Sequence, residues 1–193
     1  MIYTHIFNGL QVSTGDILCT RDGEESSLFG QLWRLLGKLV PGEVDHCLVY
    51  IGPGGRCIES GPKGVIVFEM QGEVWDARPL FSRRWILDTF HGAAYPLASR
   101  GLSAGEEKRI RLEVASYCLE LKAESKPYNL NFFDPQRDGA FYCSQLVYKA
   151  YLVQGIDLNT NLGVPAGVLG AVVFPQEIWN ACKHKLAEKT QSE

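Results

Sequence analysis

Three strand-forming segments follow one another between residues 44 and 70, and the turns between them leave little freedom in how they pair. VDHCLVYI at 44–51 is rich in β-branched and apolar residues, and RCIES at 56–60 and GVIVFEM at 64–70 follow closely. The four residues GPGG at 52–55 separate the first two segments. Glycine and proline at this spacing between two apolar runs predict a β-hairpin with a four-residue loop.

The length of that loop determines which side chains share a face of the hairpin. A four-residue GPGG loop pairs Ile51 with Arg56. Glu59 then opposes Leu48 and lies diagonally across from His46, on the same face. A loop one residue longer or shorter would turn Glu59 to the other face, as a solvent-facing carboxylate at a strand end. The sequence alone does not decide between these two placements of Glu59.

The remaining segments predict an α+β class and a single domain over residues 1–193. The clearest helix start is Ser103, because Glu106 three residues later completes a capping box. We expect that helix to run to about Lys122 and to bury Ile110, Val114, Cys118 and Leu121. Further strands are expected at 15–18 and, on either side of an HGA turn, at 85–90 and 93–97; further helices at 26–40, 143–153 and 175–189.

Composition excludes several functional classes. The chain is 46% hydrophobic and 21% charged, with a net charge of -3, so it can bury a core and has no basic excess for nucleic acid. Its apolar runs are too short for a transmembrane segment, and its first residues, MIYTHIFNGLQVSTGD, do not form a signal peptide. The six cysteines show no CxxC pair, which favours free thiols in a reducing, cytoplasmic compartment.

Cys143 stands where a polar, turn-rich run becomes a helix, in GAFYCSQLVYKAY at 139–151. A thiol at a helix N-terminus is favoured as thiolate by the unpaired N–H groups and the helix dipole. The same N–H groups would stabilise an oxyanion. The alternative is a buried structural cysteine, which is the more common role of a free thiol in an apolar setting.

A nucleophilic cysteine needs a base, and His46 is the histidine that lies within a strong strand pattern. Glu59 on the same face would orient its imidazole, although a histidine in a strand is often structural. Tyr142 and Ser144 flank Cys143 and are assigned to substrate binding or the oxyanion, with a core role for the Tyr142 ring as the alternative.

The ordered set GDIL, DHCLVYIG, IES with GPKGVIVFE, FYCSQLVYKAY and FPQEIW resembles the circularly permuted, NlpC-type papain-like proteins of the YiiX/YaeF group. Lecithin–retinol acyltransferases are more distant relatives of that group. The resemblance runs from about Gly15 to Trp179. It implies a permuted papain-like fold, with a central antiparallel sheet or barrel packed against helices. It also implies a bacterial origin, and Cys143 as nucleophile, His46 as base and Glu59 as orienter.

The predicted activity is that of a cysteine hydrolase that cleaves an amide bond in a peptide-like or N-acyl substrate, without cofactor or metal. Acyl transfer or thioester hydrolysis on a lipid is one alternative, and non-catalytic binding of a lipid or peptide is another. A metal site from His46, Cys47, Cys57 and His91 is disfavoured, because neighbouring strand residues face opposite sides. The segment 26–40 is expected to form a lid or a groove wall.

Overall fold

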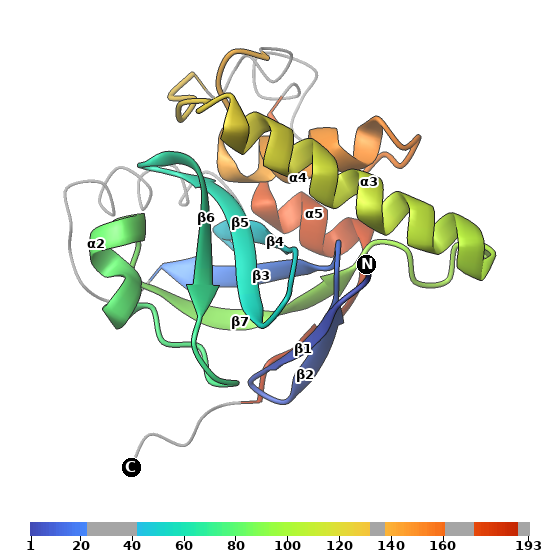
Figure 1. Ribbon diagram of the computed structural model, residues 1–193, viewed down its shortest axis with the longest axis horizontal. Helices are drawn as coiled ribbons and strands as arrows, with labels where there is room; N and C mark the ends of the chain where they lie inside the picture. Colours follow the sequence, from blue (N-terminus) through green and yellow to red (C-terminus); the bar gives the residue numbers. More distant parts are fainter. Residues whose placement is uncertain (23–41, 132–137, 161–171, 189–193) are drawn as a thin grey trace.

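The computed structural model describes residues 1–22, 42–131, 138–160 and 172–188 (Figure 1). Within these ranges six strands form one antiparallel sheet in the order β6-β5-β4-β3-β7-β8. These strands are β3 (Ile17–Asp22), β4 (His46–Tyr50), β5 (Gly55–Gly61), β6 (Gly64–Met70), β7 (Asp88–Tyr95) and β8 (Lys183–Leu186). A smaller sheet pairs β1 (Thr4–Phe7) with β2 (Leu10–Ser13). The α+β class predicted from the sequence is confirmed.

Helices α3 (Ala104–Ala123), α4 (Cys143–Leu152) and α5 (Pro175–Ala181) gather on one side of the six-stranded sheet (Figure 1). The core beneath them joins Cys47 and Val49 of β4 to Val114 of α3 and Leu146 of α4. The short helices η1 (Arg78–Leu80) and α2 (Phe81–Arg84) lie apart from these, beside β6 (Figure 1).

A second core lies on the opposite face of the sheet. Leu48 and Tyr50 of β4 pack there with Phe7 of β1 and with Trp75, in the segment between β6 and η1. Alternate residues of β4 therefore enter different cores, as the two-residue period of a strand requires. His46 has the same parity as Leu48, and Cys47 the same parity as Val49.

Several sequence predictions are confirmed. The GPGG hairpin has the predicted register, since Val49 pairs with Ile58 and Tyr50 with Cys57. Ser103 and Glu106 form the capping box of α3, whose predicted apolar positions are all buried. Helix α4 begins at Cys143 and is followed by Gly155, whose positive φ of 75° suits the turn that ends a helix.

The prediction of two strands separated by an HGA turn at 85–97 is wrong. One strand, β7, runs through this region, and its pairing with β3 passes from Gly92 directly to Phe90. His91 is thus the extra residue of a β-bulge, which bends a strand without ending it. Gly92 is needed for close packing, because a Cβ atom there would lie 2.2 Å from the carbonyl oxygen of Lys185 on β8.

The last predicted helix is also wrong in its second half. It starts at Pro175 as expected but ends at Ala181, and Cys182 has extended φ and ψ of -113° and 154°. Residues 183–186 then form β8 against β7, so His184 lies in a strand and not in a helix. Pairing with a free strand edge overrides the helical propensity of KHKLAEK, because helix propensity is only a weak local preference.

The first residues, for which no element was predicted, form the β1–β2 hairpin. Its turn residues Asn8 and Gly9 both have positive φ, 44° and 78°, as a two-residue hairpin turn requires. The helix and lid predicted at 26–40 lie outside the described residues. In the parts of the chain that the structure describes, no helix has the length and apolar character needed to cross a membrane.

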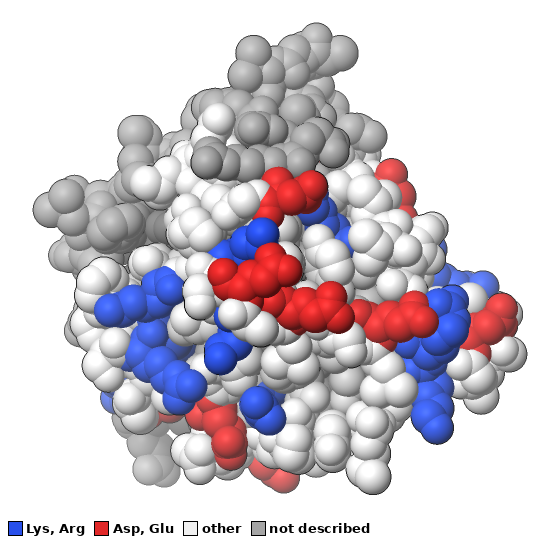
Figure 2. Space-filling view, turned by 45° about the horizontal axis from the view of Figure 1, so that its top comes forward, with Lys and Arg blue, Asp and Glu red and all other residues white. Residues whose placement is uncertain are grey.

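The surface charge is mixed in sign. Figure 2 shows acidic and basic side chains interspersed on the face that it displays, with an acidic row across its middle. This agrees with the net charge of -3 and offers no extended basic stripe on that face of the kind that follows a nucleic-acid backbone.

Candidate active site

Cys143 is the first residue of α4, and the helix is held by its core. Leu146, Val147 and Ala150 are completely buried beneath it. Tyr142 precedes the helix in extended conformation, and its N–H donates to the Gln145 side chain at 3.3 Å. The first N–H groups of α4 have no partner within the helix, so they create a positive environment around the thiol. Cys143 is itself 1% exposed.

His46 begins β4 and reaches Glu59 on β5. Its Nε2 lies 2.9 Å from Oε2 of Glu59, and both side chains are buried. The contact is the diagonal one predicted from the hairpin register, so Glu59 lies on the face of His46 and not in solvent. The register set by the GPGG loop therefore places these two groups on one face of the hairpin.

His46 also interacts with the Cys143 thiol. Through charge and hydrogen bonding, each of the two side chains shifts the pKa of the other. Because Nε2 is engaged by Glu59, Nδ1 is the ring nitrogen left for the sulfur. Burial alone would lower the pKa of His46, but the Cys143 sulfur and the Glu59 carboxylate outweigh it and raise that pKa well above its ordinary value.

Cys47 also acts on the Cys143 thiol. Hydrogen bonding from the Cys47 thiol is the largest cause that lowers the pKa of Cys143, and the Cys47 backbone N–H lowers that pKa further. His46 adds to this, against the opposing effect of burial, and the pKa falls well below its ordinary value. Burial raises the pKa of Cys47 itself, so Cys47 keeps its proton and acts as the donor.

Glu59 is held by a buried arginine that the sequence analysis did not single out. Arg84, the last residue of α2, donates from Nε to Oε1 of Glu59 at 2.9 Å and from Nη2 to Oε2 at 2.8 Å. Burial would raise the pKa of Glu59, but Arg84 and His46 lower it to about 2. Glu59 is therefore an ionised acceptor for the imidazole at any ordinary pH.

Arg84 also binds Asp88, the first residue of β7. Its Nη1 and Nη2 donate to the two carboxylate oxygens of Asp88, each at 2.9 Å. Asp88 also accepts from the Thr20 hydroxyl at 2.8 Å and from Trp75 Nε1 at 3.2 Å. The neighbouring Arg83 is exposed, and the sequence FSRRW carries no signal that tells which arginine points inward.

The side chains of Tyr142 and Ser144 bind the chain segment before α5. The Tyr142 hydroxyl accepts from the Val173 N–H at 3.2 Å, and the Ser144 hydroxyl donates to the Val173 carbonyl at 2.7 Å. Both residues are at most 2% exposed. These contacts are structural links that hold the start of α4.

Tyr128 was not predicted from the sequence and lies close to the Cys143 sulfur. It forms an isolated bridge with Phe141, two residues before Cys143. Burial raises the pKa of its hydroxyl well above the ordinary value, and the nearby Cys143 sulfur raises it further. Tyr128 therefore adds a neutral phenol, and no charge, to the surroundings of the thiol.

The alternative metal site is not assembled. Cys47 belongs to the core under α4 and Cys57 to the core on the other face, while His91 lies on β7. Nδ1 of His91 accepts from Nε of Arg21 at 2.8 Å. Among the described residues no group of three or more histidine, cysteine, aspartate or glutamate side chains is arranged to hold a metal ion.

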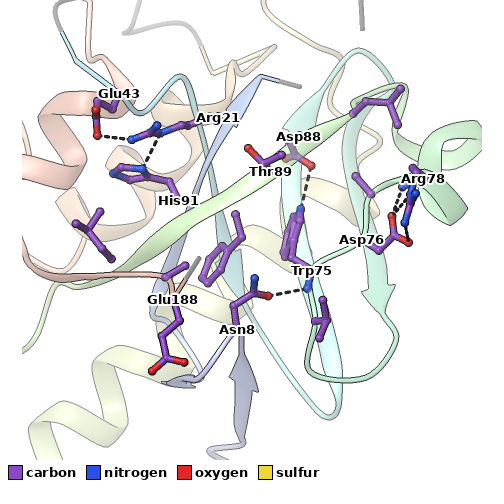
Figure 3. Close-up of a pocket in the computed structure, with 16 residues that line it drawn as sticks. Asn8, Arg21, Glu43, Trp75, Asp76, Arg78, Asp88, Thr89, His91 and Glu188 are labelled. Carbon is purple, nitrogen blue, oxygen red and sulfur yellow. Dashed lines mark hydrogen bonds and ion pairs between the residues drawn. The ribbon is translucent and has the colours of Figure 1, made fainter. Parts of the chain in front are cut away.

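A pocket of about 900 Å³ opens beside β7 (Figure 3). Its walls carry Arg21 and His91 on one side and Arg78 on the other, with Trp75 and Asp88 between them (Figure 3). Cys143, His46 and Glu59 are not among its described lining residues. Asp88 and Trp75, however, both line this pocket, and they hydrogen-bond to each other. Through Asp88 the pocket touches the buried network that includes Arg84 and Glu59.

Cys143, His46 and Glu59 are thus brought together from three separate elements, in the order thiol, imidazole and carboxylate. An arrangement of this kind can hold a thiolate–imidazolium pair in a water-poor site. No family model, curated protein or solved structure matches the chain.

Proposed function

We propose that this protein is a cysteine hydrolase that cleaves an amide bond through a thioester on Cys143. The observation that carries the proposal is the continuous contact from the Cys143 sulfur through His46 to the ionised, buried Glu59. Buried ionisable groups with strongly shifted pKa values are concentrated at functional sites, so this imidazole–carboxylate pair is a candidate for a chemical role. The resemblance to the permuted papain-like proteins points to the same three residues.

In the first half of the reaction, the Cys143 thiolate attacks the carbonyl carbon of the substrate. The lowered pKa of the thiol means that the nucleophile is charged before substrate arrives. N–H groups at the start of α4 hold the oxyanion, a contribution of about 100-fold to 1,000-fold in rate in well-studied enzymes. The His46 imidazolium then protonates the leaving amine, and the thioester remains on the sulfur.

In the second half, neutral His46 takes a proton from water, and the resulting hydroxide attacks the thioester. Collapse of the tetrahedral intermediate returns the thiolate and releases the acid, and the proton on His46 restores the ion pair. Glu59 stays ionised throughout and keeps Nε2 of the ring engaged, so Nδ1 faces the reacting atoms.

Small peptide-like, N-acyl or lipid-like substrates, a cytoplasmic location and a permuted papain-like fold are parts of the same proposal. Transfer of the acyl group to an amine or lipid acceptor differs from hydrolysis only in what attacks the thioester. Adding a primary amine during turnover separates the two reactions, because a transferase forms the new amide faster than the acid.

The proposal is tested by trapping an acyl group on Cys143 and detecting it by mass. The protein is incubated with a 4-nitrophenyl ester at pH 6, quenched in acid and measured by intact mass. We expect one added acyl group in the wild-type protein and none in Cys143→Ala, and a much slower addition in His46→Ala. Iodoacetamide at the same pH is expected to label wild type once and Cys143→Ala not at all.

Cys118→Ala provides the matched control. Cys118 is a fully buried thiol of α3 whose pKa burial raises to about 12, so it stays protonated and unreactive. Its removal is expected to leave both acylation and alkylation unchanged. Equal labelling of wild type and Cys143→Ala would overturn the nucleophile, and alkylation without any acyl adduct would favour a binding protein.

A further inference from the structure

The buried hydrogen-bond network extends from Glu59 to Arg84 and Asp88. In this extension the carboxylates outnumber the guanidinium. Arg84 is 0% exposed and is shared between two carboxylates, Glu59 and Asp88, through four N–H···O bonds of 2.8–2.9 Å. One guanidinium therefore faces two negative charges. Among the described residues in contact with this cluster, His46 is the group that can supply the missing positive charge.

The backbone between Arg84 and Asp88 is shaped to close this cluster. Trp85 ends α2 in the left-handed region, with φ of 59° and ψ of 26°, a conformation that is rare for a bulky side chain. This turn brings Asp88 back onto the guanidinium four residues later. Lys63 covers the exposed Trp85 ring, with its Nζ 3.4 Å from the ring centroid, and holds the turn from outside.

The bidentate bond to Glu59 has two opposite effects on His46. It fixes the carboxylate in the plane and direction that Nε2 needs, because a guanidinium fork leaves a carboxylate little freedom. It also neutralises much of the charge of Glu59, which weakens the attraction for an imidazolium in a low-dielectric site. Asp88 binds the other side of the same guanidinium, through two bonds of 2.9 Å.

We propose that Arg84 and Asp88 form a positioning unit for the base, in which Arg84 orients Glu59 toward His46 and Asp88 restores the negative charge that keeps His46 an imidazolium. This inference rests on the proposed function, since it assigns a task to residues that act only through Glu59 and His46.

The other titratable groups near this cluster are the same in every variant compared, including Asp45, which precedes His46 in the sequence. Cys47 on its own strand, Tyr128 in the loop after α3 and Cys57 on β5 are all buried, and burial raises each pKa well above its ordinary value. They stay neutral from pH 4 to 9. Cys143 and His46 each shift the pKa of the other, so a pH profile reports the pair and not either group alone.

The experiment is the pH dependence of Cys143 alkylation by iodoacetate, with second-order rates measured by intact mass from pH 4 to 9. An anionic reagent favours the thiolate–imidazolium pair, so wild type is expected to give a bell-shaped profile whose upper limb marks loss of the imidazolium proton. In Asp88→Asn we expect that limb to move down by about one pH unit, because one nearby negative charge is lost.

Thr20→Val is the matched control. It removes the hydroxyl that donates to Asp88 at 2.8 Å, in a completely buried side chain, and keeps every charge. It is expected to lower the melting temperature and leave the upper limb in place. Should Asp88→Asn fail to fold, because its new amide N–H₂ faces the guanidinium, Asp88→Ser removes the same charge without that clash.

Arg84→Lys separates orientation from charge. An ammonium keeps the positive charge but cannot form the parallel pair of bonds to Glu59, so the upper limb should stay while acylation by a 4-nitrophenyl ester slows about tenfold. The proposal would be overturned if the upper limb of the alkylation profile lay at the same pH in folded Asp88 variants and in Thr20→Val. A wild-type protein that shows no bell at all would instead overturn the proposed function, before any variant is compared.

Discussion

Glu59→Gln tests the buried charge network through its effect on folding, independently of any substrate. The change keeps the shape of the side chain and one acceptor oxygen but removes the charge that Arg84 and His46 share. Both proteins in the comparison should also carry Cys143→Ala, so that the thiolate does not titrate in the range of interest. The quantity measured is the difference in the free energy of unfolding between the two proteins.

The magnitude follows from the pKa of Glu59, which lies at about 2 in the folded protein against an ordinary 4.5. At about 1.4 kcal/mol per pKa unit, this difference corresponds to about 3 kcal/mol of stability from the ionised carboxylate. Because the folded-state pKa is the lower one, the contribution is complete above pH 4.5 and is lost as the pH falls toward 2. His46 is protonated in both states over that range, so it does not contribute to the slope.

Urea unfolding at pH 7, 5, 4 and 3, followed by tryptophan fluorescence, measures this effect. We expect Glu59→Gln to be less stable by about 3 kcal/mol at pH 7 and the gap to shrink below pH 4.5. Asp76→Asn is the control, because Asp76 pairs with an exposed Arg78 and should change stability by about 0.5 kcal/mol or less. A gap that is constant from pH 7 to 3, or absent at pH 7, would refute the reasoning.

Three further predictions concern the nucleophile and the frame that holds it. Cys47→Ala removes the thiol donor to Cys143, so the pKa of Cys143 should rise and its alkylation by iodoacetamide at pH 5 should slow about tenfold; an unchanged rate would contradict the donor role. Ser103→Ala removes the cap of α3 and should cost about 1 kcal/mol in urea unfolding, with Cys143 alkylation unchanged. Gly92→Ala would place a Cβ atom 2.2 Å from the Lys185 carbonyl, so hydrogen exchange in β8 should accelerate while exchange in α4 stays slow; protection of β8 as in wild type would show that the close approach is not needed.

The parts of the site that could be predicted from the sequence are those that depend on short-range geometry. The four residues of GPGG set the register of one hairpin, and that register alone places Glu59 diagonally across from His46. The apolar spacing after Cys143 likewise indicated a helix that begins at the thiol. The Asn8–Gly9 turn belongs to the same class and was a readable hairpin signal that the analysis passed over.

The predictions that failed concern segments whose structure depends on distant partners. Residues 183–186 have a helical composition but form a strand at the free edge of β7. His91, predicted to lie in a turn, is the extra residue of a β-bulge where β7 pairs with β3. Local propensities differ by less than about 1 kcal/mol per residue, so a row of backbone hydrogen bonds to an existing strand outweighs them.

The burial and the charge pairing of the site residues depend on the tertiary structure and cannot be predicted from the local sequence. Nothing in FSRRW distinguishes the exposed Arg83 from Arg84, which the fold buries completely between Glu59 and Asp88. The same is true of Cys47, which becomes a donor to Cys143 because α4 lies over its strand. A local pattern can specify which residues are neighbours along a strand or helix. Desolvation and charge pairing, which set the pKa values of Cys143, His46 and Glu59, depend on what other elements place around them.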